Sequence, residues 1–121
     1  MSEWVEIELP YPPSVNTYWR HSRGRHYISE KGKAFQFAAV KACEPFDPFV
    51  GAVVIKLEVY KPDKRKRDLD NLTKGLFDAL VNAGIIEDDN DEIITEYSNK
   101  SMGICRPKGK VVVKIRSCNG G

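Results

Sequence analysis

Residues 61–92 read KPDKRKRDLDNLTKGLFDALVNAGIIEDDNDE, and this stretch combines a clear helix pattern with an unusual arrangement of charge. Apolar residues recur at helical spacing between residues 69 and 81, and Gly84 follows as a terminator. We therefore predict a helix that opens at Asp68 or Asp70 and runs through about residue 82.

The sequence on either side of this helix predicts a sheet and a second helix. Ser29 can cap a helix over about residues 30–43, and residues 16–28 form either a strand-turn-strand or an ordered loop. Alternation and β-branched residues predict four strands, at residues 5–9, 51–60, 93–97 and 111–115. This order predicts one small α+β domain over residues 1–121, with two helices packed on a mixed sheet.

The composition excludes several classes of protein. The chain has 121 residues, 41% of them hydrophobic, which is enough for one domain with its own core. Its three cysteines have neither the number nor the spacing of a disulfide framework or a zinc site. No signal peptide and no apolar run of membrane-spanning length is present, so we expect a cytoplasmic protein without a membrane partner.

The charge in the opening stretch is segregated, although the net charge of the chain is only +2. A dense cationic run comes first and consists of Lys61, Lys64, Arg65, Lys66 and Arg67. Asp68 and Asp70 follow at once, and a second acidic segment spans residues 87–92. Such a pattern is explained if the carboxylates hold a divalent metal and the cations hold phosphate oxygens against it. We therefore interpret the stretch as the active site of a metal-dependent nuclease.

The distance along the chain allows Asp89 to join the first two aspartates. A helix over residues 70–83 is roughly 20 Å long, and five extended residues after Gly84 cover roughly 17 Å. If this segment folds back along the helix, the acidic segment returns to the helix start. The cluster would then bind Mg²⁺ or Mn²⁺, and Lys74, one turn after Asp70, could stabilise the charge that develops on the phosphate.

Each of these residues also has a purely structural interpretation. Asp68 suits a helix N-cap, and Asp70 gains from the helix dipole. Lys74 lies four residues from both Asp70 and Asp78 and could simply pair with them on a solvated face. Under this interpretation the chain is a non-catalytic nucleic-acid-binding protein. The acidic segment is not a calcium loop, because Ile93 occupies the position where that loop needs glycine.

Three blocks of the sequence resemble the RusA family of Holliday junction resolvases. They are LPYPPSVNTYWRHSRGRHYISEKGKAF at residues 9–35, PDKRKRDLDNLTKGLFDALVNAG at residues 62–84 and the acidic pair Asp88-Asp89. The resemblance implies a small homodimeric endonuclease of mixed α/β fold. It would bind four-way DNA junctions and resolve them by paired symmetric nicks with Mg²⁺, for which Mn²⁺ can substitute. A related nuclease acting on flaps or replication forks is the alternative that the sequence leaves open.

The resemblance also implies roles for individual residues. The catalytic and metal-binding carboxylates fall on Asp68, Asp70 and Asp89, and the catalytic lysine falls on Lys74. Spacing from Gly84 favours Asp89 over the neighbouring Asp88. The phosphate contacts are assigned to the cationic run Lys61, Lys64, Arg65, Lys66 and Arg67, together with Arg20 and His21.

Five aromatic positions carry further hypotheses. Tyr18 and Trp19 are candidates to stack on unpaired bases, whereas Phe77 fits the helix core. Phe46 and Phe49 are candidates for a dimer surface, with ordinary core packing as the alternative.

Overall fold

The structure is a computed structural model that describes residues 4–22 and 24–118. At positions 15, 16, 20–22, 25 and 26 only the backbone is described. Arg20 and His21 therefore lie in a described strand, but their side chains fall outside the described part of the structure.

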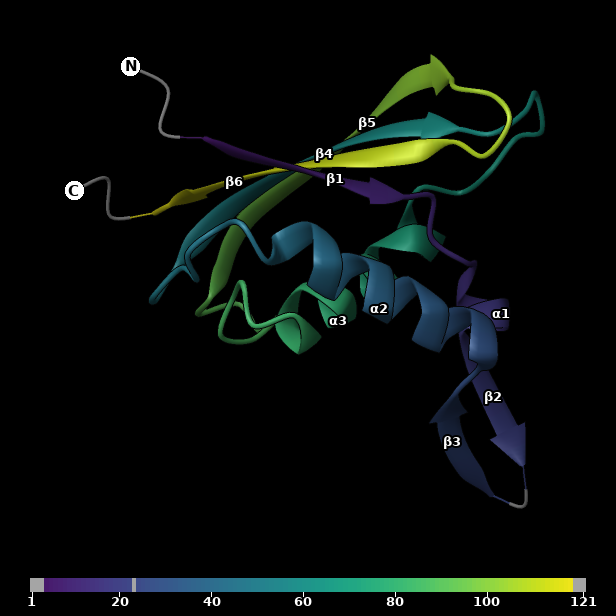
Figure 1. Ribbon diagram of the computed structural model, residues 1–121, viewed down its shortest axis with the longest axis horizontal. Coiled ribbons are helices and arrows are strands. Elements are labelled where there is room, and N and C mark those ends of the chain that lie inside the picture. Colours follow the sequence, from purple (N-terminus) through teal and green to yellow (C-terminus); the bar gives the residue numbers. More distant parts are fainter. Residues whose placement is uncertain (1–3, 23, 119–121) are drawn as a thin grey trace.

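A mixed sheet of four strands forms one layer of the molecule (Figure 1). Its strands are β1 (Val5–Pro10), β4 (Val53–Lys61), β5 (Ile94–Ile104) and β6 (Lys110–Ser117). Their order is β1-β6-β4-β5, and only β4 and β5 are parallel neighbours. Parallel neighbours require the chain to cross back between them, and helix α3 (Asp70–Asn82) makes that crossing.

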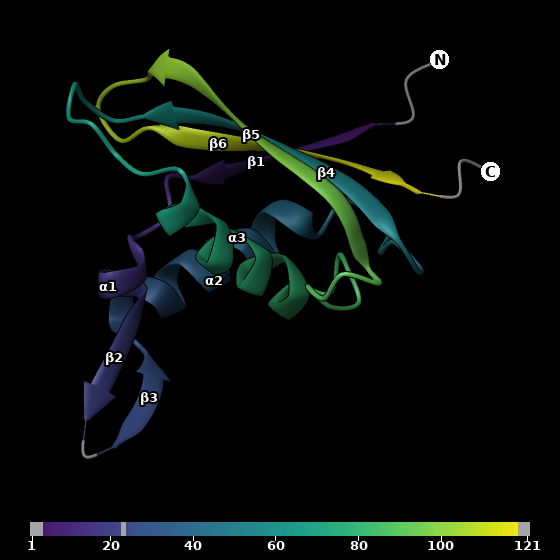
Figure 2. The ribbon, with the colours of Figure 1, turned by 180° about the vertical axis from the view of Figure 1, so that it is seen from behind.

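Helices α2 (Glu30–Cys43) and α3 cover one face of the sheet and leave the other face open (Figures 1 and 2). Strand β6 shows why, because Val111, Val113 and Ile115 are fully buried and alternate with less buried residues. Alternate side chains point to opposite faces of a strand, so one face of β6 belongs to the core. From α3, Leu76 and Leu80 are fully buried in the same core. The predicted α+β fold is confirmed.

The predicted helices and strands agree with the structure, with two differences. Strand β5 is longer than predicted, and a single helical turn at Val15–Tyr18 was not predicted. Helix α2 has the expected bounds, and its Gly32 amide donates to the Ser29 hydroxyl at 3.1 Å. Strand β5 continues seven residues beyond the expected end at 97. Its second half lacks alternation because it is exposed on both sides, so hydrogen bonding to β4 extends the strand where the residue pattern could not reveal it.

The segment at residues 16–28 is a strand-turn-strand, as one of the two alternatives predicted. Strands β2 (Trp19–Ser22) and β3 (Arg25–Ile28) form a separate hairpin, which follows a single helical turn, α1 (Val15–Tyr18). Figure 1 shows the hairpin extending away from the sheet, beyond the ends of the two long helices.

Tyr18 fixes this hairpin to both long helices. Its side chain is fully buried, so the prediction that Tyr18 stacks on DNA bases is wrong. A Cβ atom on Gly75 of α3 would lie 3.0 Å from the Tyr18 ring, and one on Gly32 of α2 would lie 2.8 Å from its carbonyl oxygen. Both helices thus carry glycine where Tyr18 leaves no room for a side chain.

Other expectations about apolar residues are settled by burial. Phe77 is 7% exposed and belongs to the core, as expected. Phe46 and Phe49 pack against the core, which agrees with the alternative of ordinary core packing for them. Among the described residues, no helix has the length and hydropathy needed to cross a membrane.

Candidate active site

The start of helix α3 presents two neighbouring carboxylates to solvent. The side chains of Asp68 and Asp70 are both exposed. The Asp70 amide donates to the Asp68 carboxylate at 3.0 Å, so this carboxylate satisfies one of the free N–H groups at the helix start. The N-cap residue of α3 is Leu69, without a side-chain cap bond, so Asp68 lies one residue before the expected cap position and binds the first helical amide instead. Both negative charges lie at the positive end of the helix dipole.

Lys74 lies one turn further along the helix and is held by an aromatic ring. Its ammonium group lies 5.2 Å from the centre of the Trp19 ring, within the range of a cation–π interaction. Among the described residues, Lys74 forms no ion pair with Asp70 or Asp78, so the pairing that helical spacing allowed is not what orients it. Trp19 is the partner that reasoning from helical spacing missed, because it comes from a distant segment.

The opposite end of α3 carries a second group of acids. Asp78 is partly buried, and its pKa is raised, first by burial and second by the negative charge of Asp89, while Lys74 acts in the opposite direction. Asp89 itself is exposed. The acidic segment is attached at the beginning of β4, where the Gly51 amide donates to the Glu87 carboxylate at 2.6 Å.

Contacts between α3 and β5 show why the acidic segment stays at this end. Tyr97 packs edge-on against Phe77 at 5.1 Å between ring centres, and further along the strand Asn99 donates to the Thr73 hydroxyl at 3.2 Å. Strand β5 thus runs antiparallel to α3, and the residues just before it lie near the end of the helix. Although the lengths allowed it, the acidic segment does not return to the helix start. Within the described chain, no three or more His, Cys, Asp or Glu side chains are grouped as a metal site.

The cationic loop between β4 and α3 is organised by an acid within it. Asp63 accepts hydrogen bonds from both guanidinium nitrogens of Arg67, at 2.7 and 3.2 Å, and from the Arg65 amide at 2.9 Å. These contacts hold the pKa of the Asp63 carboxyl well below its usual range, the Arg67 hydrogen bond being the largest cause. The Arg67 guanidinium also lies 5.6 Å from the Tyr11 ring centre.

The residues of this loop therefore divide into two groups. Lys64, Arg65 and Lys66 are exposed and accessible to a polyanion, although the Arg65 guanidinium also lies 3.6 Å from the Asp63 carboxylate. Arg67 is engaged by Asp63, and Lys61 is half-buried at the end of β4. The sequence did not reveal this division, because it does not show which cations the Asp63 carboxylate contacts.

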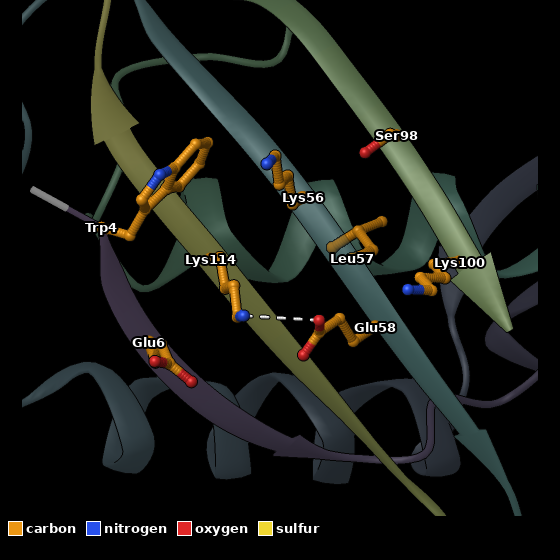
Figure 3. Close-up of a pocket in the computed structure, with 8 residues that line it drawn as sticks. All are labelled: Trp4, Glu6, Lys56, Leu57, Glu58, Ser98, Lys100 and Lys114. Atoms are coloured by element: carbon orange, nitrogen blue, oxygen red, sulfur yellow. Dashed lines mark ion pairs between the residues drawn. The ribbon is translucent and has the colours of Figure 1, made fainter. Parts of the chain in front are cut away.

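The open face of the sheet contains a hollow that is separate from these residues. It has a volume of about 320 Å³ and is lined by Trp4, Glu6, Lys56, Leu57, Glu58, Ser98, Lys100 and Lys114 (Figure 3). Lys114 forms an ion pair with Glu58 at 3.4 Å, and the Lys56 ammonium lies 4.7 Å from the Trp4 ring centre. None of the residues predicted for the active site lines this hollow.

Comparison with known proteins places the chain in a family. The family model described as Endodeoxyribonuclease RusA matches residues 10–116. A crossover junction endodeoxyribonuclease of Enterobacteria phage HK97 is 39% identical over 120 residues, which cover 95% of each chain. Proteins of the same name from Escherichia coli O139:H28 and Shigella sonnei are 39% identical over 112 residues and 45% identical over 86 residues. The alignment with the Escherichia coli protein covers 90% of this chain and 91% of the relative. The alignment with the Shigella sonnei protein covers 69% of this chain and 72% of the relative. The chain therefore belongs to the RusA family of endodeoxyribonucleases.

Proposed function

We propose that this protein is a Mg²⁺-dependent endonuclease that resolves four-way DNA junctions by paired symmetric nicks. The observation that carries the proposal is the pair of exposed carboxylates at the start of α3, directly after a loop of exposed cations. The names of its relatives, crossover junction endodeoxyribonucleases with 39–45% identity, supply the substrate class. We expect it to act in the cytoplasm, on four-way branched DNA.

The carboxylates of Asp68, Asp70 and Asp89 are the groups that would hold the metal. Carboxylate oxygens suit the hard ions Mg²⁺ and Mn²⁺, and all three side chains are exposed. When bound, the metal supplies Lewis-acid chemistry toward a phosphodiester and a source of hydroxide at neutral pH. In a single chain Asp89 lies by Asp78, at the other end of α3, so its contribution needs a test of its own.

Two groups of cations have separate roles in the proposed reaction. Lys64, Arg65 and Lys66 would bind phosphates of the DNA backbone, which gives affinity without sequence preference. Lys74, on the helical turn after Asp70, would stabilise negative charge on the phosphate that is attacked. The contact with the Trp19 ring, at 5.2 Å from the ring centre, would orient the Lys74 ammonium for this role.

Paired cuts require two active sites. One chain of 13.7 kDa carries one set of these residues, so we propose that a two-fold dimer acts on the junction. The two-fold symmetry of a four-way junction matches such a dimer.

Cleavage of a labelled immobile four-way junction, compared with a linear duplex of the same sequence, tests this function. We expect paired symmetric nicks in the junction only, dependent on Mg²⁺ or Mn²⁺ and abolished by EDTA. The Asp70→Asn variant should bind the junction but not cleave it. Asp47→Asn, an exposed substitution after α2, is the matched control and should cleave normally.

Three outcomes would contradict parts of the proposal. Full activity of the Asp70→Asn variant would remove α3 from the active site. Preference for flaps or forks in a competition assay would change the substrate to another branched DNA. Junction binding without cleavage in any metal would leave a non-catalytic DNA-binding protein.

A further inference from the structure

The last part of the chain carries charge of one sign. After Glu96 the sequence contains no Asp or Glu, but it contains six cationic residues: Lys100, Arg106, Lys108, Lys110, Lys114 and Arg116. A segment of one sign attracts a partner of the opposite sign. The chain belongs to a family of endodeoxyribonucleases, so the polyanion that it meets is DNA. The structure shows which of these cations already have a partner within the protein.

Three of the six cations are engaged by side chains on the sheet. The contacts are Lys110 with Glu8 at 3.3 Å, Lys114 with Glu58 at 3.4 Å, and Arg116 with the Trp4 ring centre at 5.1 Å. A fourth, Lys100, lines the hollow on the open face of the sheet (Figure 3). Arg106 and Lys108 lie in the turn between β5 and β6 and are exposed. Among the described residues neither forms an ion pair, so a polyanion can bind them without displacing a carboxylate.

The turn that carries these two cations, residues 105–109, is attached to the beginning of the cationic loop. The Cys105 amide donates to the Lys61 carbonyl oxygen at 2.8 Å, and the Gly109 amide closes the turn on the Cys105 carbonyl oxygen at 2.7 Å. Gly109 has a φ of +72°, and a Cβ atom there would lie 2.6 Å from the Tyr60 carbonyl oxygen. The backbone of the turn therefore packs directly against the end of β4.

This attachment brings two cationic segments to the same end of the sheet. Figures 1 and 2 both show the turn between β5 and β6 beside the connection from β4 to α3. Lys64 follows Lys61 by three residues, over which extended chain covers at most about 11 Å. One helical turn of duplex DNA is about 34 Å long, so one duplex arm can contact both segments.

We propose that the turn between β5 and β6 is a second DNA-binding element, in which Arg106 and Lys108 bind phosphates of the duplex arm that the cationic loop also holds. The backbone attachment fixes the spacing of the two segments, and together they orient the arm beside the start of α3. Phosphate contacts of this kind position DNA without reading its sequence. The inference rests on the proposed function and adds a second segment to its DNA-binding surface.

Neutralising the turn tests the contact. The double variant Arg106→Gln with Lys108→Gln should reduce the slope of log K against log salt by roughly 0.9 for each lost phosphate contact, or roughly 1.8 for both. Fluorescence anisotropy measures the slope on a labelled linear duplex and on a four-way junction, in EDTA so that no strand is cut. We expect the same reduction on both, because both present duplex phosphates.

Two matched variants separate a phosphate contact from other causes. Lys41→Gln with Lys56→Gln removes the same charge from the last turn of α2 and from the open face of the sheet, and it should keep the wild-type slope. Arg106→Lys with Lys108→Arg retains both charges in the turn and should also keep it. Circular dichroism verifies that every variant is folded.

The outcomes separate this inference from the proposed function. An unchanged slope in the Arg106→Gln, Lys108→Gln variant would overturn the second element and leave the nuclease proposal intact. An equal reduction in the Lys41→Gln, Lys56→Gln variant would also overturn it, because net charge alone would then explain the loss. A slope reduced by the turn variant alone, in a protein that cuts no branched DNA, would support the second element and overturn the nuclease proposal.

Discussion

The two ends of helix α3 carry the same type of side chain in different surroundings. At the start, Asp68 and Asp70 are exposed, and the Asp63–Arg67 ion pair shapes the cationic loop beside them. At the other end, Asp78 is partly buried, and the charge of Asp89 makes its ionised form less favourable. Exposure leaves the Asp68 and Asp70 carboxylates accessible to a metal ion and a phosphate, whereas burial beside another acid raises the pKa of Asp78.

This difference shows that acidic residues in one stretch need not form one site. Spacing along the chain allowed a single cluster, but α3 keeps its two ends apart, at about 1.5 Å per residue. The following predictions test whether the two ends act together.

The largest effect is expected from Asp89→Asn. If both ends of α3 serve one reaction, this variant should lose junction cleavage by at least about 100-fold, as expected for Asp70→Asn, because a ligand of the metal that would stabilise transition-state charge is removed. Single-turnover cleavage measures the loss. Asp91→Asn, two residues further along the same exposed segment, is the control and should stay near wild type. Normal cleavage by Asp89→Asn would confine the site to the helix start.

The next largest effect is expected from a substitution at Gly75, which lies between the two ends of α3 and faces the Tyr18 ring. Gly75→Val places side-chain atoms against the Tyr18 ring, which already lies 3.0 Å from a Cβ at this position. Overpacking of this kind should lower the free energy of unfolding by about 1–3 kcal/mol. Urea denaturation measures it, with Asn71→Ala on the exposed side of α3 as the control. An unchanged midpoint would mean that the hairpin is not held at Gly75.

A smaller effect should follow from neutralising the exposed cations at the helix start. Changing Lys64, Arg65 and Lys66 to Gln should weaken binding to all DNA and reduce the slope of log K against log salt by roughly 0.9 for each lost phosphate contact. Fluorescence anisotropy at several salt concentrations gives the slope. Lys41 is an exposed lysine on α2 that forms an ion pair with Glu44. Lys41→Gln is the control for removal of a single surface charge. An unchanged slope for the triple variant would place the DNA on another surface.

The smallest effect is expected from Asp78→Asn at the other end. The folded-state pKa of Asp78 is raised above its ordinary value of 3.8, mainly by burial. The folded state therefore holds the proton more tightly than the unfolded state, and stability is lost as pH rises from the ordinary pKa through the raised one. Asp78→Asn removes this loss, so it should stabilise the protein slightly at pH 7 and lose that advantage below the ordinary pKa. Thermal unfolding across pH values tests the sign, and destabilisation at pH 7 would contradict it.

Much of the local structure could be predicted from the sequence because its signals lie within a few residues. The apolar spacing of α3, the Ser29 cap of α2 and the alternation of β1 each depend on near neighbours in the chain. The second half of β5 could not be predicted this way. Its residues are exposed on both sides, and hydrogen bonds to a strand more than 30 residues earlier hold it in place.

The same distinction between local signals and long-range contacts applies to the candidate site. The sequence by itself determined which residues carry carboxylates, that a helix begins at Asp68 or Asp70, and which cations precede it. The tertiary structure alone decided that Trp19 holds Lys74, that Asp63 engages Arg67, and that Asp89 lies near Asp78. The physical reason is range: helix periodicity and caps are set by neighbouring residues, whereas these contacts depend on where the packing of the core places segments that are separate in the chain.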